Sequence, residues 1–169
     1  MNIIVNVDKN WAIGRNGALL FPIAADLQNF KRLTLHKVVV MGRKTLESLP
    51  GGKPLKERLN VVLSASMPET EGLYICRSID EMQQLFLKEP FAGLTTDDVF
   101  VIGGETVYRQ LLPLCSKAYI TKVEAAAAEP DAFFPDIDSM DEWRITGTSE
   151  RFFQAETAYR FFIYENIKL

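Results

Sequence analysis

The sequence predicts an α/β fold with a mostly parallel central sheet, an antiparallel strand at its C-terminal edge, and helices on both faces. Strand patterns alternate with helix patterns along most of the chain, which is typical of a parallel sheet covered by helices. The strand patterns are apolar and rich in β-branched residues, as expected for buried strands. The pattern then changes, because residues 151–153 and 159–165 follow one another as antiparallel strands.

The first third of the chain begins this alternation. Ile3-Ile4-Val5-Asn6-Val7 predicts a buried first strand, and residues 24–33 predict the first helix. A second strand at 38–41 leads into a short helix at 45–49, which Pro50-Gly51-Gly52 ends.

The remaining elements continue the same pattern. Further strands are expected at 59–64, 73–76, 99–102 and 117–123. Ser78, with Glu81 three residues later, has the form of a capping box and predicts a helix over 78–87. Another helix at 105–112 is expected to stop at Pro113. We find no internal repeat or linker, so we expect one domain over residues 1–169.

Composition excludes several classes of protein. At 169 residues, 47% hydrophobic and 24% charged, the chain has the profile of a globular domain. No apolar run approaches the roughly 18 residues that a membrane span needs, and MNIIVNVDKN lacks the pattern of a secretory signal. Cys76 and Cys115 show no metal or redox spacing, which favours free buried thiols over a disulfide. We therefore expect a cytoplasmic protein with no membrane partner.

Charge is distributed unevenly along the chain. Residues 1–65 carry ten Lys or Arg against four Asp or Glu, whereas residues 66–169 carry nine against eighteen. Two interpretations stay open: the solvated faces differ in sign, or the first part binds a small anion through phosphate or carboxylate groups. Nucleic acid is not an expected partner, because the net charge is −3 and no basic stripe is interleaved with aromatic residues.

Residues 14–34 are the strongest candidate for chemistry. They run from Gly14-Arg15-Asn16-Gly17 through an apolar loop at 19–23 into a helix that carries Asp26 and Phe30. Those two residues are four apart and share one helix face, which is otherwise apolar. A carboxylate that complements the helix dipole is the commoner role when Asp26 is considered alone, and Phe30 is more often core. The apolar surroundings nevertheless make Asp26 the first candidate for a functional carboxylate.

Two strand-to-helix junctions have phosphate-binding character. In Gly42-Arg43-Lys44-Thr45 a glycine allows a tight turn, and cationic and hydroxyl groups follow at a helix start. In Gly103-Gly104-Glu105-Thr106 the glycine pair would let a ligand touch the backbone. Neither junction matches G-x-G-x-x-G or the P-loop, and a glycine needed only for a turn stays an alternative at each. Two such junctions in one parallel sheet favour a dinucleotide.

Arg58 and His36 are less informative. Arg58 is either a surface arginine or a clamp for a carboxylate, and the sequence alone leaves both open. His36 is the only histidine and lies in a polar turn, so we expect neither a His-dependent triad nor a metal site.

Taken together, these segments resemble dihydrofolate reductase of the bacterial type, in the right order and over nearly the whole chain. The matching residues before position 50 are Ile13, Gly14, Gly17, Asp26, Leu27, Phe30, Lys31, Thr34, Met41, Gly42, Arg43, Lys44, Thr45, Glu47 and Ser48. Those after it are Pro54, Leu55, Arg58, Asn60, Val61, Val62, Leu63, Ser64, Val101, Ile102, Gly103, Gly104, Tyr108, Leu112, Pro113, Thr121, Asp131, Phe134 and Pro135. Any one match is weak, but so many in order are specific.

The resemblance implies NADPH-dependent reduction of 7,8-dihydrofolate to 5,6,7,8-tetrahydrofolate, with a hydride to C6 and a proton to N5, in support of one-carbon metabolism. It implies a monomer that binds dihydrofolate and antifolate inhibitors. Asp26 would anchor the pteridine through two charge-assisted hydrogen bonds and support protonation of N5 through water. Thr121 would hydrogen-bond to Asp26, and burial in an apolar cleft would raise the pKa of the carboxyl.

The resemblance also implies roles for other residues. Phe21 and Tyr108 would join Asp26 and Thr121 in the catalytic set. The substrate site would comprise Ile4, Val5, Asp26, Leu27, Phe30, Leu49, Leu55, Arg58, Ile102 and Thr121. The cofactor site would comprise Ile13, Gly14, Gly17, Ala18, Leu19, Gly42, Arg43, Lys44, Thr45, Leu63, Ser64, Ser66, Arg77, Ile102, Gly103, Gly104, Glu105, Thr106, Val107 and Tyr108. Arg43 and Arg77 would favour NADPH over NADH, because the 2′-phosphate needs cationic partners.

The chain departs from the family pattern in two loops. Leu20-Phe21 stands where the family has Pro-Trp, and Ala24 stands at the following proline position. Phe21 cannot donate the hydrogen bond with which the indole helps to hold a water near the pteridine. In the second loop Pro130-Asp131-Ala132 replaces Gly-Asp-Thr, and Pro130 has no N–H, so any loop-to-loop hydrogen bonding there must be rearranged.

Two other functions stay open as alternatives. A related-fold NADPH reductase of riboflavin biosynthesis would account for the sheet and the glycine pair, but not for Asp26 with Phe30 and Arg58. A non-catalytic NADPH- or folate-binding module would account for the changes at Phe21 and Pro130.

Overall fold

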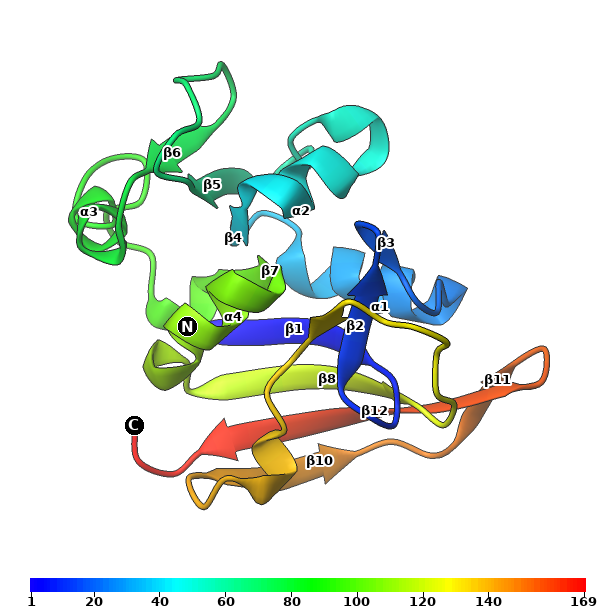
Figure 1. Cartoon of the computed structure of the whole chain (residues 1–169). Coiled ribbons are helices and arrows are strands. Elements are labelled where there is room, and N and C mark those ends of the chain that lie inside the picture. The colour runs from blue at the N-terminus through cyan, green and yellow to red at the C-terminus, as the bar shows by residue number, and fades with distance from the viewer.

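A nine-stranded sheet organises the fold, and the computed structural model describes all 169 residues of the chain. Its strands lie in the order β10-β12-β8-β1-β7-β4-β5-β6, with β11 paired to β12 (Figure 1). The parallel strands are β1 (Asn2–Val7), β4 (Val38–Gly42), β5 (Leu59–Leu63), β6 (Tyr74–Cys76), β7 (Val99–Gly103) and β8 (Lys117–Val123). The antiparallel strands are β10 (Trp143–Thr148), β11 (Phe152–Gln154) and β12 (Thr157–Asn166). This is the mostly parallel α/β sheet with an antiparallel C-terminal edge that the sequence predicts.

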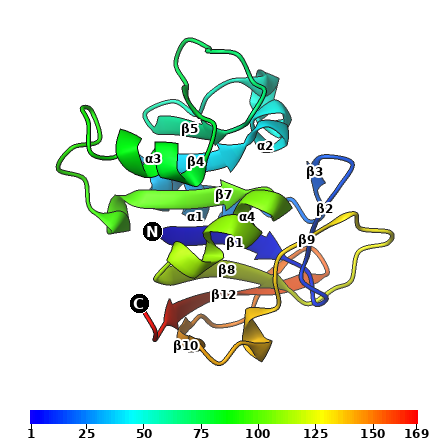
Figure 2. The same ribbon diagram turned by 60° about the vertical axis from the view of Figure 1, so that its left-hand side comes forward.

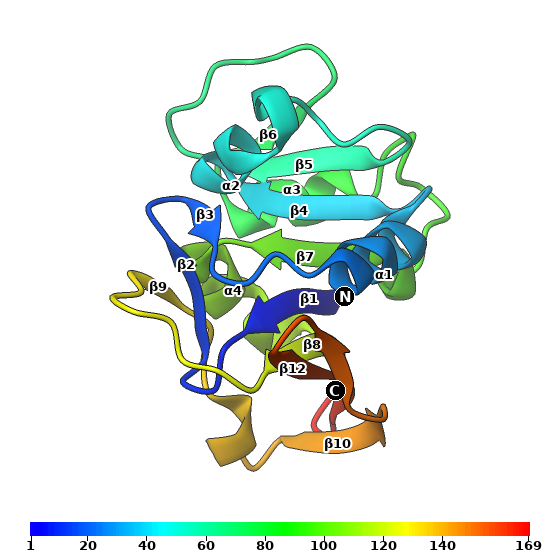
Figure 3. The same ribbon diagram turned by 90° about the vertical axis from the view of Figure 1, so that its right-hand side faces the viewer.

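Four α-helices cover both faces of the sheet, as predicted. They are α1 (Ala24–Thr34), α2 (Arg43–Ser48), α3 (Ile79–Leu85) and α4 (Glu105–Leu111). Figure 2 shows α3 and α4 in front of the sheet, and the turned view in Figure 3 brings α1 to the near face. No helix is long and apolar enough to cross a membrane.

The alternation of side chains along the strands divides the core between the two faces. Val38 and Val40 of β4 belong to a buried cluster that includes Val107 and Leu111 of α4. Their neighbour Val39 points to the opposite face, where it packs in a second cluster that includes Leu46 of α2. Because β4 is buried on both sides, its sequence is a continuous apolar run rather than an alternating one.

A second, three-stranded sheet lies beyond the carboxyl end of β1, and the sequence did not predict it (Figure 2). It consists of β3 (Ala18–Leu19), β2 (Ala12–Arg15) and β9 (Ala132–Phe133). Asn16 and Gly17 have φ of 51° and 77° and form the turn between β2 and β3. The backbone of β2 pairs with β9 at Gly14 and Ala132, which ties the loop before α1 to the loop after β8.

Several predicted boundaries differ from the structure. The second helix starts at Arg43 rather than 45, and the fourth ends at Leu111, where Leu112–Leu114 continues as a 3₁₀ turn. The capping box at the third helix is only half formed. The Ser78 side chain accepts from the Glu81 N–H at 3.1 Å, but the Glu81 carboxylate accepts from the Arg77 N–H instead of that of Ser78.

Other short elements were not predicted. These are β10 and the 3₁₀ turns Pro50–Gly52, Thr96–Asp98 and Ile137–Ser139.

Candidate active site

Asp26 lies near the start of α1 and is bound to the sheet through both of its oxygens. The Thr121 hydroxyl on β8 donates to Oδ1 at 2.5 Å, and the Asn6 amide on β1 donates to Oδ2 at 3.0 Å. The predicted hydrogen bond from Thr121 is therefore confirmed. Asp26 accepts no N–H of its own helix, whose N-cap is Ile23 without a side-chain cap. The carboxylate thus faces the sheet rather than capping the helix.

The environment of Asp26 raises the pKa of its carboxyl above the ordinary value, as predicted. Removal from water is the main cause, since burial penalises the charged form. The hydrogen bonds from Thr121 and Asn6 act in the opposite direction because they stabilise the carboxylate, and they offset only part of the effect of burial. A carboxyl group of this kind can hold a proton nearer to neutral pH than a surface aspartate can.

The face of α1 that carries Asp26 and Phe30 is less buried than the sequence suggests. Both residues are partly exposed, and Leu27 beside them is 51% exposed, so an apolar surface next to the carboxylate remains open. Thr34 is the one fully buried residue of the helix. Its hydroxyl donates to the Phe30 carbonyl at 2.8 Å.

Arg58 lies at the other end of α1. Its Nε and Nη2 both approach the Thr34 hydroxyl at 3.3 Å, and its Nη1 donates to the Lys56 carbonyl at 2.6 Å. The structure gives this guanidinium no carboxylate partner within the chain, so its positive charge remains available to a ligand. Its orientation is nevertheless fixed by these hydrogen bonds.

The loop before Arg58 is held by Asn60, which the sequence analysis did not single out. The Asn60 side chain accepts from the Leu55 N–H and donates to the Leu55 carbonyl, both at 2.9 Å. Leu55 and Leu49 then pack, partly exposed, against the cluster on this face that also includes Ile102. Three predicted substrate-site residues are thereby brought onto one face of the sheet.

Ile4, Val5 and Tyr108 are buried around β1, but on different faces of the sheet. The side chain of Ile4 leaves the strand on the face of Asn6 and Asp26, whereas Val5 packs with Tyr108 on the α4 face, so the predicted contact of the Val5 side chain with the substrate is not supported. Tyr108 of α4 is 4% exposed, and its hydroxyl donates to the Ile4 carbonyl at 2.8 Å. Burial and the nearby charge of Asp26 both raise the pKa of this phenol far above its ordinary value. Tyr108 therefore stays neutral and serves as a fixed link between α4 and β1.

The two glycine junctions meet, as the dinucleotide hypothesis requires. A Cβ on Gly104 would lie 3.4 Å from the Thr45 hydroxyl, and one on Gly42 would lie 3.2 Å from Val107. Gly103 has φ of 120°, and a Cβ there would lie 3.2 Å from the Tyr108 ring. The glycines thus allow the starts of α2 and α4 to pack closely against each other.

Charged residues near these junctions are engaged with the protein itself. Glu105 accepts from the Phe133 N–H of β9 at 3.1 Å and pairs with Arg109 at 3.1 Å. The guanidinium of Arg43 lies 3.2 Å from Glu47 in an exposed pair. The side chains of Lys44 and Thr106 make no hydrogen bond within the chain. The predicted contact of Glu105 with a cofactor therefore competes with its contact to β9.

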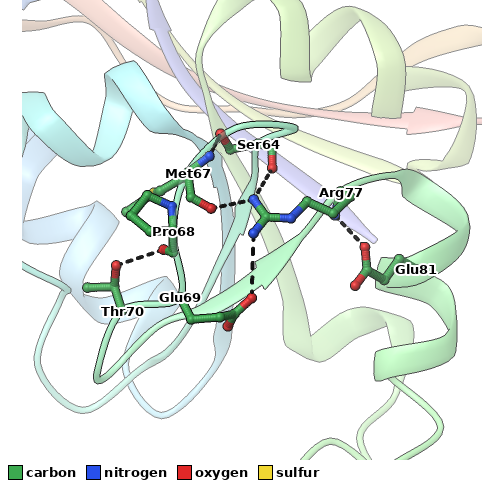
Figure 4. A network of polar contacts seen from close by, with 7 residues as sticks. All are labelled: Ser64, Met67, Pro68, Glu69, Thr70, Arg77 and Glu81. Atoms are coloured by element: carbon green, nitrogen blue, oxygen red, sulfur yellow. Dashed lines mark hydrogen bonds and ion pairs between the residues drawn. The ribbon is translucent and has the colours of Figure 1, made fainter.

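Arg77 organises the loop where the sequence predicted a site for a 2′-phosphate (Figure 4). One guanidinium nitrogen donates to the carbonyls of Ser64 and Met67, and another lies 3.6 Å from Glu69. The Ser64 hydroxyl accepts from the Met67 N–H at 3.1 Å. Arg77, Ser64 and the neighbouring Ser66 are thus brought together. Arg77 also stabilises the loop at 64–69 through these contacts.

Two residues hold the loops around the opening of the site. Asp131 donates its N–H to the Gly14 carbonyl at 3.0 Å, and its carboxylate accepts from the Asn16 N–H at 2.8 Å. The loop-to-loop hydrogen bonds therefore run through Asp131, and Pro130 does not prevent them. Asp8 is 3% exposed, and its carboxylate accepts from the N–H groups of Ala12 and Ala127 at 2.9 Å. The sequence analysis missed Asp8, although its place in a turn-like Asp-Lys-Asn segment was a signal.

A family model described as dihydrofolate reductase matches residues 1–166. The chain belongs to this family. A dihydrofolate reductase of Haemophilus influenzae is 35% identical over 144 residues, which cover 85% of this chain and 83% of that protein. One of Bos taurus is 34% identical over 151 residues, with 82% and 80% covered.

Some relatives are larger proteins. A bifunctional dihydrofolate reductase-thymidylate synthase 2 of Arabidopsis thaliana is 39% identical over 151 residues, which are 81% of this chain but only 26% of that protein. The chain therefore spans about a quarter of such two-function relatives and about four fifths of the single-function ones. Membership of the dihydrofolate reductase family fits the placing of Asp26, Thr121 and the two glycine junctions described above.

Proposed function

We propose that this chain catalyses the NADPH-dependent reduction of 7,8-dihydrofolate to 5,6,7,8-tetrahydrofolate, with a hydride delivered to C6 and a proton to N5. The observation that carries the proposal is the Asp26 carboxylate, which is bound from β1 and β8 and has a raised pKa beside an open apolar surface. The family of the chain supports the same reaction.

Asp26 is the group that binds and orients the pteridine in this proposal. A carboxylate can accept from a ring N–H and from the adjacent amino group at the same time, and such paired charge-assisted bonds are strong and directional. Thr121 keeps the plane of the carboxylate fixed. Because the carboxyl pKa is raised, Asp26 is protonated at higher pH than an ordinary aspartate, which suits a group that supports protonation of N5 through water.

The remaining residues of the substrate site divide into two groups. Phe30, Leu27, Leu49 and Leu55 provide apolar surface for the rings of the substrate, with Ile4 and Ile102 on the sheet beneath. Arg58 lies at the far end of α1 with its guanidinium oriented by Thr34. A planar guanidinium suits a bidentate contact with the glutamate carboxylate of the substrate.

The residues present fit a dinucleotide phosphate. Added Cβ atoms at 42 and 103 would crowd Val107 and Tyr108, and one at 104 would contact the Thr45 hydroxyl, so all three positions keep backbone without side chains where the starts of α2 and α4 meet. Gly42, Arg43, Lys44 and Thr45, with residues 103–108, would hold the pyrophosphate, and residues 13–19 would cover the nicotinamide. Leu63, Ser64, Ser66 and Arg77 would hold the adenosine end. When bound, NADPH supplies the hydride.

A direct assay tests the proposal. The purified chain is mixed with NADPH and dihydrofolate, and the nicotinamide absorbance is followed, then the assay is repeated with NADH. We expect rapid decay with NADPH and slower decay with NADH. No decay at micromolar protein would reject the reductase. Tight binding of both ligands in calorimetry without turnover would instead identify a non-catalytic binding module.

Further properties belong to the same proposal. We propose that the 169 residues form one domain, that the chain acts as a monomer in the cytoplasm, and that antifolate inhibitors compete with dihydrofolate at Asp26. The single large sheet supports the single domain, and the two free, buried cysteines support the cytoplasmic location. Size-exclusion chromatography with light scattering tests the oligomeric state.

A further inference from the structure

Asn6 occupies an unusual position on β1, because its amide contacts both the candidate catalytic carboxylate and the active-site loop. Its Nδ2 donates to Asp26 Oδ2 at 3.0 Å and to the Phe21 carbonyl at 3.1 Å. An amide nitrogen has two protons, so these two bonds use the whole donor capacity of the side chain.

The register of the sheet explains why Asn6 reaches Asp26 together with Thr121. Asn6 and Thr121 are direct partners across the parallel pair β1 and β8, so their side chains leave the sheet on the same face. Asp26 of α1 lies above this pair and accepts one hydrogen bond from each, on opposite oxygens. Two neighbouring strands therefore fix the carboxylate in rotation as well as in position.

We propose that Asn6 is a positioning residue for the reduction of dihydrofolate, which couples the Phe21 segment of the active-site loop to the Asp26 carboxylate. The inference rests on the proposed function, since it takes Asp26 as the group that supports protonation of the substrate. The proposal adds Asn6 to the site. This residue could not be recognised from the sequence, because it lies within an apolar strand pattern.

The coupling has a physical consequence at the point where this chain departs from its family pattern. Phe21 has no side-chain donor, so this residue cannot be linked to the polar part of the site through its ring. The backbone carbonyl of Phe21 is linked there instead, through Asn6. The same amide stabilises the charged form of Asp26 and so counteracts the effect of burial on the pKa.

Few groups other than the Asp26 carboxyl itself could change the pH at which Asp26 titrates. Its hydrogen-bond partners, Asn6 and Thr121, are both neutral. The titratable side chain that its charge reaches is Tyr108 on α4, whose hydroxyl is bound to the Ile4 carbonyl and whose pKa lies far above neutral pH. A shift in the midpoint of the pH profile therefore reports on the carboxyl of Asp26.

Asn6→Ala is the main test, with Asn2→Ala as its matched control. Asn2 lies on the same strand, and its amide donates to the Asp97 carbonyl at 3.0 Å, far from Asp26. The measurement is turnover with dihydrofolate and NADPH as a function of pH. Loss of a donor to the charged carboxylate should move the midpoint of the alkaline decline upward by about half to one pH unit in Asn6→Ala. Asn2→Ala should keep the midpoint of the parent.

A direct titration removes the dependence on activity. Carbon-13 labelling of aspartate lets the Asp26 carboxyl be followed by NMR, with the resonance assigned from its absence in Asp26→Asn. The carboxyl pKa should rise in Asn6→Ala by the same amount as the kinetic midpoint. Asn6→Ser, whose short hydroxyl cannot bridge both acceptors, should shift it in the same direction if the alanine variant does not fold.

The outcomes separate the two levels of the argument. A parent chain without dihydrofolate-dependent oxidation of NADPH would overturn the proposed function. A parent that turns over, with an Asp26 pKa that is unchanged or lowered in both Asn6 variants, would overturn the role of Asn6 alone. An equal shift in Asn2→Ala would also overturn it, because the effect would then be a general one on the strand.

Discussion

Thr121 and Asp26 are 95 residues apart in the sequence, yet the hydroxyl of the first donates to the carboxylate of the second at 2.5 Å. The contact joins α1 to β8 across the face of the sheet. It gives the carboxylate a fixed plane, which a group that must pair with two donors of a ligand requires. The same contact also limits how far burial can raise the pKa of Asp26.

Asp26→Asn tests the carboxylate directly. The amide keeps the size of the side chain but can neither accept at both positions nor carry the proton. Turnover should fall at least about tenfold, on the usual contribution of acid–base groups. Affinity for NADPH should stay within about a factor of two, because Asp26 lies outside the proposed cofactor site. Steady-state kinetics and fluorescence titration measure the two quantities, and unchanged turnover would remove Asp26 from the mechanism.

The raised pKa of Asp26 also predicts how stability depends on pH. An acid whose pKa is higher in the folded state binds protons more strongly there, so its favourable contribution is full below the unfolded pKa. That contribution is lost as the pH rises from about 3.9 to the folded value. The free energy of unfolding of the parent should therefore fall relative to that of Asp26→Asn as the pH rises above about 4. Urea unfolding at several pH values measures the difference, and a difference independent of pH would contradict the shift.

Phe21→Trp tests the departure in the active-site loop. An indole would add a donor where Phe21 has none, near a carbonyl that Asn6 already binds. We expect the pH profile of turnover to change while activity is retained. Profiles that superimpose would mean that the indole position has no influence in this chain. Phe153→Trp, at a ring on β11 that is 59% exposed and lies outside the cluster around Phe21, controls for the addition of a tryptophan.

Asp131→Ala tests the hydrogen bonds between the two loops. The substitution removes the acceptor for the Asn16 N–H but leaves the backbone bond from the Asp131 N–H to the Gly14 carbonyl. Turnover should fall about threefold to tenfold, equivalent to the net contribution of one ordinary, solvent-exposed hydrogen bond. Glu129→Ala is the matched control, because its pair with Arg15 is 80% exposed on the glutamate side and such pairs contribute little. Equal effects of both variants would reject a specific role for Asp131.

Arg77→Ala distinguishes two roles for the guanidinium drawn in Figure 4. If Arg77 binds the 2′-phosphate, KM should rise about tenfold for NADPH and much less for NADH, which lacks that group. If Arg77 only holds the loop through Ser64 and Met67, KM should rise by the same factor for NADPH and NADH. Glu69→Ala serves as the control, since the glutamate is 80% exposed and lies 3.6 Å from Arg77.

The fold could be predicted from the sequence where an element is long and where its burial determines its residue types. The strands at 38–41 and 99–102 were predicted because strands covered on both faces are continuous apolar runs. The strand β10 was missed because its side chains are mostly exposed, so its composition lacks that signal. The second sheet was missed because β3 and β9 have two residues each, and pairing over so short a length depends on distant backbone.

The site divides in the same way. Asp26 and Thr121 could be predicted because matched segments in order point to them, and their hydrogen bond is present. Asn6 could not, since an asparagine in an apolar strand reveals its target only when the register with β8 is known. Asn60 was quoted as part of a strand pattern, but its double hydrogen bond to Leu55 depends on the path of the loop before Arg58. The contacts through which Arg77 stabilises the loop at 64–69 likewise depend on where that loop turns.

The position of β1 in the sheet has a consequence for folding during synthesis on the ribosome. The strand β1 is paired on one side with Phe100 and Val101 of β7 and on the other with Lys117 and the rest of β8, and both partners are synthesised long after it. It must wait for both partners, and such long closures slow folding. The carboxylate site, which needs Asn6, Asp26 and Thr121 at once, can therefore form only after most of the chain has emerged.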